Sequence, residues 1–469
     1  MEIHLKRSLN LKDSISILFS SMVGSGVFIT TGIIYGILDS PWLVLLTWML
    51  GAIFSMAGAF TFAKLAIFFP YAGGDYIYLK KAYSPLVAFM SGWASLLITF
   101  SASISVLGLA LGEYLSFIFP YDSKHTFFYY TLYGLDIKLG YPGLVGVGAI
   151  FLFTIINYFG IHRASIFQNL LSLIKVLGLL IFSAVAIFTH INQFQIFIPS
   201  PNFADIYDKS PFILIAIIPV IFSYLGWNMV TYIAEEVKDP EKNISRTIIY
   251  GSGLVAILYL IVNLAFLLTL SPEQLRKNEG IATLSAIQVF GEPAKFYFSI
   301  FFCLVILGSL SATIIGGSRI YFAMARDGLF FPFLSKLHNH YKSPYNSLVF
   351  QAMYASIFII FDLKFLLYMI TCAILILSAL TAFSVFIFEK RGHKSKYQIP
   401  FYPITPVVYI LGCIFLVIYL AMQNPLEAFS GMSILLTSIP VYLIFRKKFL
   451  NKHHFQDSTQ SLLLQVKEK

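Results

Sequence analysis

One lysine, Lys175, stands near the middle of a long apolar run that contains "LSLIKVLGLL". A charged side chain at the centre of a bilayer costs at least about 2.5–3.5 kcal/mol, and such residues usually face partners inside the protein. Lys175 lies about nine residues, roughly 13 Å, from the nearer water-facing end of its run, which is too deep for easy snorkelling. We therefore expect Lys175 to face a cavity or polar partners and to be functional.

Two other apolar runs are interrupted by glycine and polar residues. The first reads "SSMVGSGVFITTG" and contains Gly24-Ser25-Gly26, and the second reads "PVIFSYLGWNMVTY" and contains Gly226 and Asn228. Glycine disfavours a helix by about 1 kcal/mol relative to alanine, and an unwound backbone in lipid needs partners from protein or water. If the first interruption stood by itself, close packing of glycines against another helix would explain it. The pair is better explained by a transporter's binding site.

Patterns typical of enzymes and metal sites are absent from the sequence. The three cysteines, Cys303, Cys372 and Cys413, all lie in apolar runs, without the spacing of a metal site or of a disulfide framework. No cluster of histidine, cysteine and carboxylate residues suggests catalysis. We expect no enzymatic activity, no metal and no cofactor.

The composition is that of a polytopic membrane protein. Of the 469 residues, 58% are hydrophobic and 12% are charged, against about 25% charged in soluble domains. The mean hydropathy is +0.80. A net charge of +10 could suggest nucleic acid as a partner, but the basic residues gather in the connections on one side of the membrane. We therefore expect them to face lipid headgroups and expect no nucleic-acid partner.

The apolar runs predict twelve transmembrane helices, since each crossing needs about 20 residues. The predicted spans are 14–36, 41–69, 85–119, 141–160, 166–190, 211–234, 247–270, 296–322, 346–361, 363–388, 401–422 and 427–445. They form a single transmembrane domain over residues 1–445, followed by a polar tail at 446–469.

The distribution of lysine and arginine predicts the orientation. If the N-terminus is inside, about three quarters of the 32 lysines and arginines fall in inner segments. Positive residues concentrate on the cytoplasmic side of membrane proteins. We expect both termini in the cytoplasm and the chain in the cell membrane, either a plasma membrane or a bacterial inner membrane.

Five motifs in chain order resemble the amino acid–polyamine–organocation superfamily, and within it the L-type amino-acid transporter branch. They are "GSGVF", "FPYAGGDYIYL", "FSYLGWN", "EEVKDPEKNISRTI" and "GSRIYFAMARDG", and the similarity runs over about residues 5 to 390. The resemblance implies an all-α LeuT-like fold. Its first five spans, about 11–190, and its next five, about 211–389, would form an inverted repeat, with two extra helices at about 401–445.

The resemblance also implies roles for the two interruptions. The N–H groups around Ser25 and Gly26 would bind the substrate's α-carboxylate, while carbonyl groups of Met22, Phe222 and Leu225 would accept from its α-ammonium. Phe222 would close over the substrate. The implied substrate-binding residues are Met22, Val23, Gly24, Ser25, Gly26, Phe222, Ser223, Leu225, Gly226 and Asn228.

The resemblance implies a second site, in which a lysine side chain takes the place of a bound ion. Lys175 matches a lysine whose ammonium group takes the place of a sodium ion in sodium-coupled relatives, and Ser309 and Thr313 match the other side of that site. Two departures stand out. Lys64 occupies a position that is usually glutamate, for which the sequence offers no physical reason. The 120–140 segment holds no cysteine, so we expect no disulfide-linked heavy chain.

These features favour a sodium-independent transporter of amino acids that works by alternating access, as an exchanger or as a proton-coupled symporter. Leu225 and the apolar character of the recognisable pocket favour neutral substrates, because a buried cationic side chain would lack a partner. Transport of cationic amino acids, polyamines or related amines is the alternative. An ion channel is a further alternative of another class. The sequence leaves the particular amino acid and the oligomeric state open.

Overall fold

Long apolar helices dominate the computed structural model of the chain. It describes residues 5–119, 121–132, 135–197, 203–277, 280–361, 363–423, 425–426 and 428–446. Over these residues, nine helices are long and apolar enough to cross a membrane, and the pair α1 and α2, bent by 40° at a short break, makes a tenth. Of the predicted tail at 446–469, only Arg446 is among the described residues.

The helices follow one another with short connections. In chain order they are α1 (Leu11–Met22), α2 (Gly26–Leu38), α3 (Pro41–Phe68), α4 (Asp75–Ala82), α5 (Pro85–Ala94), η1 (Ser95–Thr99), α6 (Phe100–Leu115), α7 (Tyr141–Tyr158), α8 (Ile161–Thr189), η2 (Ile191–Phe197), α9 (Phe203–Asp208), α10 (Ser210–Ser223), α11 (Met229–Tyr232), η3 (Ala234–Glu236), α12 (Pro240–Thr269), α13 (Pro272–Lys277), α14 (Ile281–Phe290), α15 (Ala294–Arg326), η4 (Pro332–Ser335), α16 (Tyr345–Phe358), α17 (Leu363–Lys390) and α18 (Ile404–Gln423), with a last helix at Ala428–Arg446.

Polar residues set where several helices begin. Asn10 and Asp13 form a reciprocal capping box at the start of α1. Ser40 and Ser84 cap α3 and α5, and each is followed by a proline at the first helical position, where the missing N–H group has no partner to lose. These caps place the starts of three helices without help from packing.

The predicted spans map onto helices, but two of them are shorter than a full crossing. The 211–234 range contains the 14-residue α10, the second interruption and the four-residue α11. The 346–361 range contains α16, also 14 residues long. The structure therefore shows a polytopic helical membrane protein with nine to ten candidate spans among its described residues.

A two-stranded antiparallel hairpin departs from the predicted all-α architecture. Strands β1 (Thr126–Leu132) and β2 (Leu135–Gly140) pair directly. The β1 sequence "TFFYYTL" is rich in aromatic and β-branched residues, which favour strands over helices. Hydropathy alone identified this segment only as a connection between spans.

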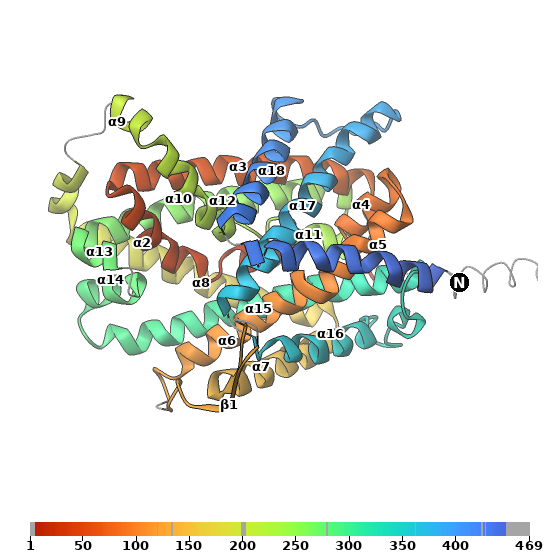
Figure 1. Cartoon of the computed structure of the whole chain (residues 1–469), viewed down its shortest axis with the longest axis horizontal. Coiled ribbons are helices and arrows are strands. Elements are labelled where there is room, and N and C mark those ends of the chain that lie inside the picture. Colours follow the sequence, from red (N-terminus) through yellow and green to blue (C-terminus); the bar gives the residue numbers. More distant parts are fainter. Residues whose placement is uncertain are drawn as a thin grey trace, which may run out of the picture.

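The helices lie side by side, with the N-terminus and α4 near one end of the bundle and α9, α13 and α14 at the other (Figure 1). We call these ends the N-terminal face and the opposite face. The broken pair α1 and α2 and the helix α10 lie inside the bundle. α1 packs against α8, α12 and α15, while α10 packs against α2 and α3. The two interruptions are thereby placed at the centre of the fold.

Candidate functional site

The first interruption leaves backbone N–H groups free. α1 ends at Met22 and α2 begins at Gly26. Among the described residues, the N–H groups of Ser25, Gly26 and Val27 donate to no other group. The first N–H groups of a helix have no partner within it, and the positive end of the helix dipole lies beside them. The start of α2 can therefore hold an anion such as a carboxylate.

The two interruptions pack directly against each other. An added Cβ at Gly26 would lie 2.7 Å from Ser223 Oγ and 3.0 Å from Ser223 Cα. In return, an added Cβ at Gly226 would lie 2.7 Å from Ser21 Oγ, and Gly226 has a φ of +108° that favours glycine. Both glycines are thus required by the close approach of the broken helices, not only by access of a ligand to the backbone.

A phenol from α12 bridges the two interruptions. The Tyr259 hydroxyl lies 2.8 Å from the carbonyl oxygen of Met22 and 3.2 Å from that of Ser223. Its single proton can bond to one carbonyl at a time. The Met22 carbonyl also accepts from the Gly24 N–H group at 3.0 Å. This carbonyl, expected to accept from a substrate ammonium, therefore already has protein donors.

The second interruption is a tight turn between α10 and α11. The Leu225 N–H group donates to the Phe222 carbonyl at 3.1 Å, and the Met229 N–H group donates to the Gly226 carbonyl at 3.0 Å. Among the described residues, nothing donates to the Leu225 carbonyl. Of the three carbonyls expected to bind an ammonium group, that of Leu225 is the most open.

Lys175 lies beside the first interruption. Its Nζ donates to the carbonyls of Ser20 and Val23, at 3.2 and 2.9 Å, and to Ser309 Oγ at 3.1 Å. Ser309 Oγ lies within hydrogen-bond distance of the same two carbonyls, and Thr313 Oγ1 donates to the Ser309 carbonyl. These carbonyls are ones that the break in α1 leaves without helical donors. The lysine therefore holds the broken end of α1 against α8 and α15.

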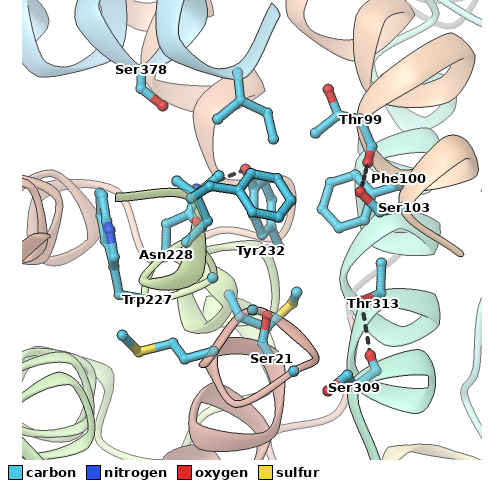
Figure 2. Close-up of a pocket in the computed structure, with 18 of the residues that line it drawn as sticks. Ser21, Thr99, Phe100, Ser103, Trp227, Asn228, Tyr232, Ser309, Thr313 and Ser378 are labelled. Atoms are coloured by element: carbon cyan, nitrogen blue, oxygen red, sulfur yellow. Dashed lines mark hydrogen bonds between the residues drawn. The ribbon is translucent and has the colours of Figure 1, made fainter. Parts of the chain in front are cut away.

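A cavity of about 190 Å³ joins the two interruptions. Of the predicted site residues it is lined by Met22, Gly24, Ser25, Gly26, Phe222, Ser223, Leu225, Gly226, Asn228, Ser309 and Thr313. Val23 and Lys175 are fully buried and lie outside the lining. Figure 2 shows Thr99, Ser103 and Thr313 on one side of this cavity and Ser378 across from Thr99, with Asn228 and Tyr232 between them. We call this cavity the central pocket.

A larger cavity of about 1690 Å³ lies between the central pocket and the opposite face. Its lining shares Ser25, Gly26, Val106 and Phe222 with the central pocket. Glu113 lines this outer cavity and not the central pocket. Phe222 thus stands at the boundary between the two spaces, where movement of one aromatic ring can change access. We call the larger cavity the vestibule.

Ion pairs close the N-terminal face. Glu236 and Arg319, 2% and 1% exposed, form a bidentate pair with N–O distances of 2.9 and 3.1 Å. Glu235 binds Arg326 at 2.9 Å and accepts from the backbone N–H group of Leu5 at 3.0 Å. These contacts tie α15 to the segment after α11 and to the N-terminal segment that precedes α1. Such buried contacts oppose separation of the helices at this face.

The structure gives Lys64 a partner. Its ammonium group forms an ion pair with Glu389 of α17 and lies 5.5 Å from the ring centre of Tyr402. Lys64 is 3% exposed, so a buried charge is compensated by an acid and an aromatic ring. The glutamate expected at position 64 would face Glu389, and the lysine avoids that repulsion.

The sequence reasoning missed several residues of the central pocket. Ser91, Ser95, Thr99 and Ser103 all line it, and their spacing of four residues places them on one face of a helix. That spacing was a detectable signal in an otherwise apolar run. Asp75 also lines the pocket, although it lies in a short helix between two spans, where hydropathy gives no indication of a site.

Comparison with known proteins gives a consistent assignment. Residues 9–445 match the model of a family described as amino acid permease. The serine/threonine exchanger SteT of Bacillus subtilis is 28% identical over 95% of this chain and 98% of its own length. The Asc-type amino acid transporter 1 of Mus musculus is 26% identical, over 97% and 84%. The large neutral amino acids transporter small subunit 2 of Oryctolagus cuniculus is 24% identical, over 94% and 80%.

The family match covers nearly all the described helices, including both interruptions and Lys175. The expectation of a membrane transporter of amino acids, and not an enzyme, is confirmed by this match and by the similar proteins. The chain belongs to the amino acid permease family of the amino acid–polyamine–organocation superfamily.

Proposed function

We propose that this permease moves small neutral amino acids across the cell membrane by sodium-independent alternating access, as an exchanger or a proton-coupled symporter. The observation that carries the proposal is the set of free N–H groups of Ser25, Gly26 and Val27 at the start of α2. Ser25 and Gly26 line the central pocket. A zwitterionic substrate supplies the carboxylate that such a helix start binds.

The substrate ammonium group would lie against the second interruption. The open Leu225 carbonyl and the second lone pair of the Phe222 carbonyl are the nearest acceptors in this arrangement. The α-carboxylate and α-ammonium would then be held by main-chain groups of two broken helices. Substrate choice would fall to the side chains of the pocket, among them the hydroxyls of Thr99, Ser103 and Thr313.

Lys175 would act in place of a coupling ion. Its ammonium group already satisfies the two carbonyls at the end of α1 together with Ser309. A sodium ion bound there would meet a fixed positive charge at close range, which opposes binding. Transport would therefore proceed without sodium.

In the transport cycle, the two ends of the pocket would open and close alternately. In this structure the vestibule lies on the opposite face, while the ion pairs Glu236–Arg319 and Glu235–Arg326 close the N-terminal face. Closure of Phe222 over the substrate and separation of the ion pairs would expose the pocket to the other side. Exclusive opening of one end at a time is what distinguishes a carrier from a channel.

The reciprocal contacts of the interruptions support a LeuT-like inverted repeat. Gly26 approaches Ser223, and Gly226 approaches Ser21, so each broken helix gives the other the same kind of contact. We assign repeat one to about 11–190, repeat two to about 211–389 and twelve spans in all. The basic residues favour a cytoplasmic location for both termini, and the lack of a cysteine in 120–140 argues against a disulfide-linked heavy chain.

The decisive experiment is uptake of radiolabelled L-serine and L-leucine into proteoliposomes, in sodium-free buffer, with and without internal unlabelled amino acid. The proposal expects uptake of at least one of them, stimulated by internal substrate if the protein is an exchanger. A strict sodium requirement would contradict the assigned role of Lys175.

Competition with alanine, arginine, putrescine and glutamate defines the substrate class. Asp75 is the one carboxylate among the described residues that line the central pocket, and it is the feature that would favour a cationic substrate. Arginine or putrescine competing best would replace the neutral assignment. Ion currents without amino-acid flux would indicate a channel.

A further inference from the structure

Asp75 occupies a constrained place in the central pocket, where α4 meets it. It is the first residue of α4 and follows Gly73 and Gly74, which have φ values of +117° and +50°. An added Cβ at Gly74 would lie 2.4 Å from the ring of Tyr232. The two glycines therefore bring the start of α4 against α11, and the carboxyl group becomes buried, with Asp75 8% exposed.

Only one oxygen of this carboxyl group is satisfied by the protein. Oδ2 accepts from the Tyr232 hydroxyl at 2.6 Å, and the Tyr232 oxygen accepts from Asn228 Nδ2 at 3.1 Å. A chain of hydrogen bonds thus connects the carboxyl group to the second interruption. Oδ1 is buried and has no hydrogen-bond partner among the described residues. An unsatisfied buried carboxylate oxygen is costly, and the cost falls when the group is protonated.

Among the described residues, no cation compensates the charge of Asp75. The titratable groups around it are phenols: Tyr232 from α11, Tyr78 from α4 itself and Tyr409 from α18. The packed helix α5 has no titratable side chain, and Glu389 at the end of α17 is paired with Lys64. Among the described residues, no lysine or arginine forms an ion pair with Asp75.

Burial raises the pKa of Asp75 from 3.8 to about 6, against the opposing effects of the Tyr232 hydrogen bond and of the nearby Thr381 hydroxyl, whose oxygen makes no hydrogen bond of normal geometry among the described residues. The group can therefore change its protonation state close to neutral pH. The vestibule and the central pocket share lining residues, and the pocket extends to Asp75. A proton route from the opposite face would therefore lead through the vestibule and the central pocket to the carboxyl group.

Resting on the proposed transport function, we propose that Asp75 is the proton-binding residue of the transport cycle. Its carboxylate takes one proton from vestibule water, and the neutral acid stays buried while the pocket changes sides. Once the ion pairs of the N-terminal face separate, the proton passes to water there and the carboxylate is restored. One proton thus crosses with the substrate: Oδ1 becomes an O–H group, while Oδ2 stays the acceptor of the Tyr232 hydroxyl at the end of the Asn228–Tyr232 chain.

The test uses the full chain in proteoliposomes with L-serine as probe, sodium-free, with the membrane potential clamped. Serine accumulation is compared between symmetric pH 7.5 and an external pH of 6.5. A gradient of one pH unit can drive up to about tenfold accumulation at one proton per substrate. We expect this ratio to fall to about one in Asp75→Asn, each variant being normalised to its own symmetric rate. Asp122→Asn removes an exposed carboxylate outside the pocket and should keep the wild-type ratio.

The failures are distinguishable. If the wild type exchanges serine but ignores the gradient, or if Asp75→Asn still responds to it, the inference is wrong and the proposed function stands. If Asp75→Asn instead abolishes competition by arginine or putrescine, Asp75 binds a cationic substrate and the inference is overturned.

If no amino acid is transported, the proposed function fails, and infrared titration of the purified protein still decides on the proton. A carboxylic acid band that titrates near pH 6 and is missing in Asp75→Asn supports proton binding at Asp75. The same band in the variant overturns it.

Discussion

Gly26 of α2 and Ser223 of α10 approach each other so closely that a single added methyl group would lie 2.7 Å from Ser223 Oγ. The contact joins the start of the helix that carries the free N–H groups to the end of the helix that carries Phe222. The shape of the carboxylate-binding backbone is therefore set by packing between the two interruptions. Substitution at Gly26 acts on both stability and substrate binding.

Gly26→Ala should lower the thermal stability of the purified protein and remove its stabilisation by serine. Overpacking of this kind costs about 1–3 kcal/mol, and a shifted α2 would no longer present its N–H groups together. Gly24→Ala is the matched control, because its added Cβ would meet only Ser309 Oγ at 3.8 Å. Thermal unfolding with and without serine measures both effects. Equal behaviour of the two variants would disprove the packing argument.

Lys175→Ala should reduce transport by at least an order of magnitude in sodium-free buffer. The substitution removes the donor shared by Ser20, Val23 and Ser309, and each buried acceptor left without a partner costs about 1–3 kcal/mol. Ser309→Ala keeps the ammonium group and its two carbonyl partners, so it should retain more activity. Initial uptake rates, corrected for the amount of reconstituted protein, check this order. Wild-type rates in Lys175→Ala would reduce the lysine to a packing role.

Many residues of the candidate site stand out in the sequence, because their signals are local. The glycines of both interruptions contradict the helical pattern around them, and Lys175 contradicts the apolar pattern of its span. The missed features depend on contacts between distant residues. Lys64 and Glu389 are 325 positions apart, and the residues next to Lys64 in the sequence do not indicate that Glu389 is its partner.

Tyr259 shows a second limit. A tyrosine in an apolar span is consistent with ordinary packing, and its bond to the Met22 carbonyl appears only when α12 is placed beside α1. The hairpin β1–β2 escapes a hydropathy pattern for another reason: its strands are too short to form a long apolar run, and only their aromatic and β-branched residues favour strand structure.

Removing one member of the buried pair Glu236–Arg319 should destabilise the protein strongly. Loss of one partner leaves an uncompensated buried charge and costs about 3–5 kcal/mol. We expect Arg319→Met to lower the unfolding temperature more than the double variant Glu236→Gln/Arg319→Met, which leaves no charge behind. The exposed pair Arg276–Asp39 is the control, because Arg276→Met should change stability by less than about 1 kcal/mol. Equal losses at both pairs would contradict the burial argument.

Asp75→Asn should raise thermal stability more at pH 8 than at pH 5. The pKa of Asp75 is raised from 3.8 to about 6, so the folded protein binds more protons than the unfolded chain between about pH 4 and 6. Stability from this group therefore falls as the pH rises through that window. Above about pH 7 the full cost, about 3 kcal/mol, is present, and asparagine avoids it. Unfolding temperatures of both proteins at the two pH values check the sign, and a pH-independent difference would contradict it.

The central pocket is lined by a row of hydroxyl groups that includes Thr99 and Ser103. Thr99 lies in the π-helical segment η1, and its Oγ1 is buried without a hydrogen-bond partner among the described residues. A substrate that brings its own hydroxyl group can satisfy this atom, whereas alanine or valine cannot. Thr99→Val keeps the shape of the side chain and removes its hydrogen-bonding capacity. The variant should therefore weaken competition by serine and threonine about five- to tenfold, the equivalent of one hydrogen bond, and leave competition by alanine nearly unchanged.

Thr154→Val is the matched control, since Thr154 is buried in α7, bonds to the Ile150 carbonyl and does not line the pocket. Inhibition constants for the four amino acids against a common label decide it. If Thr99→Val loses affinity equally for serine, threonine, alanine and valine, Thr99 shapes the pocket but does not bind the substrate hydroxyl.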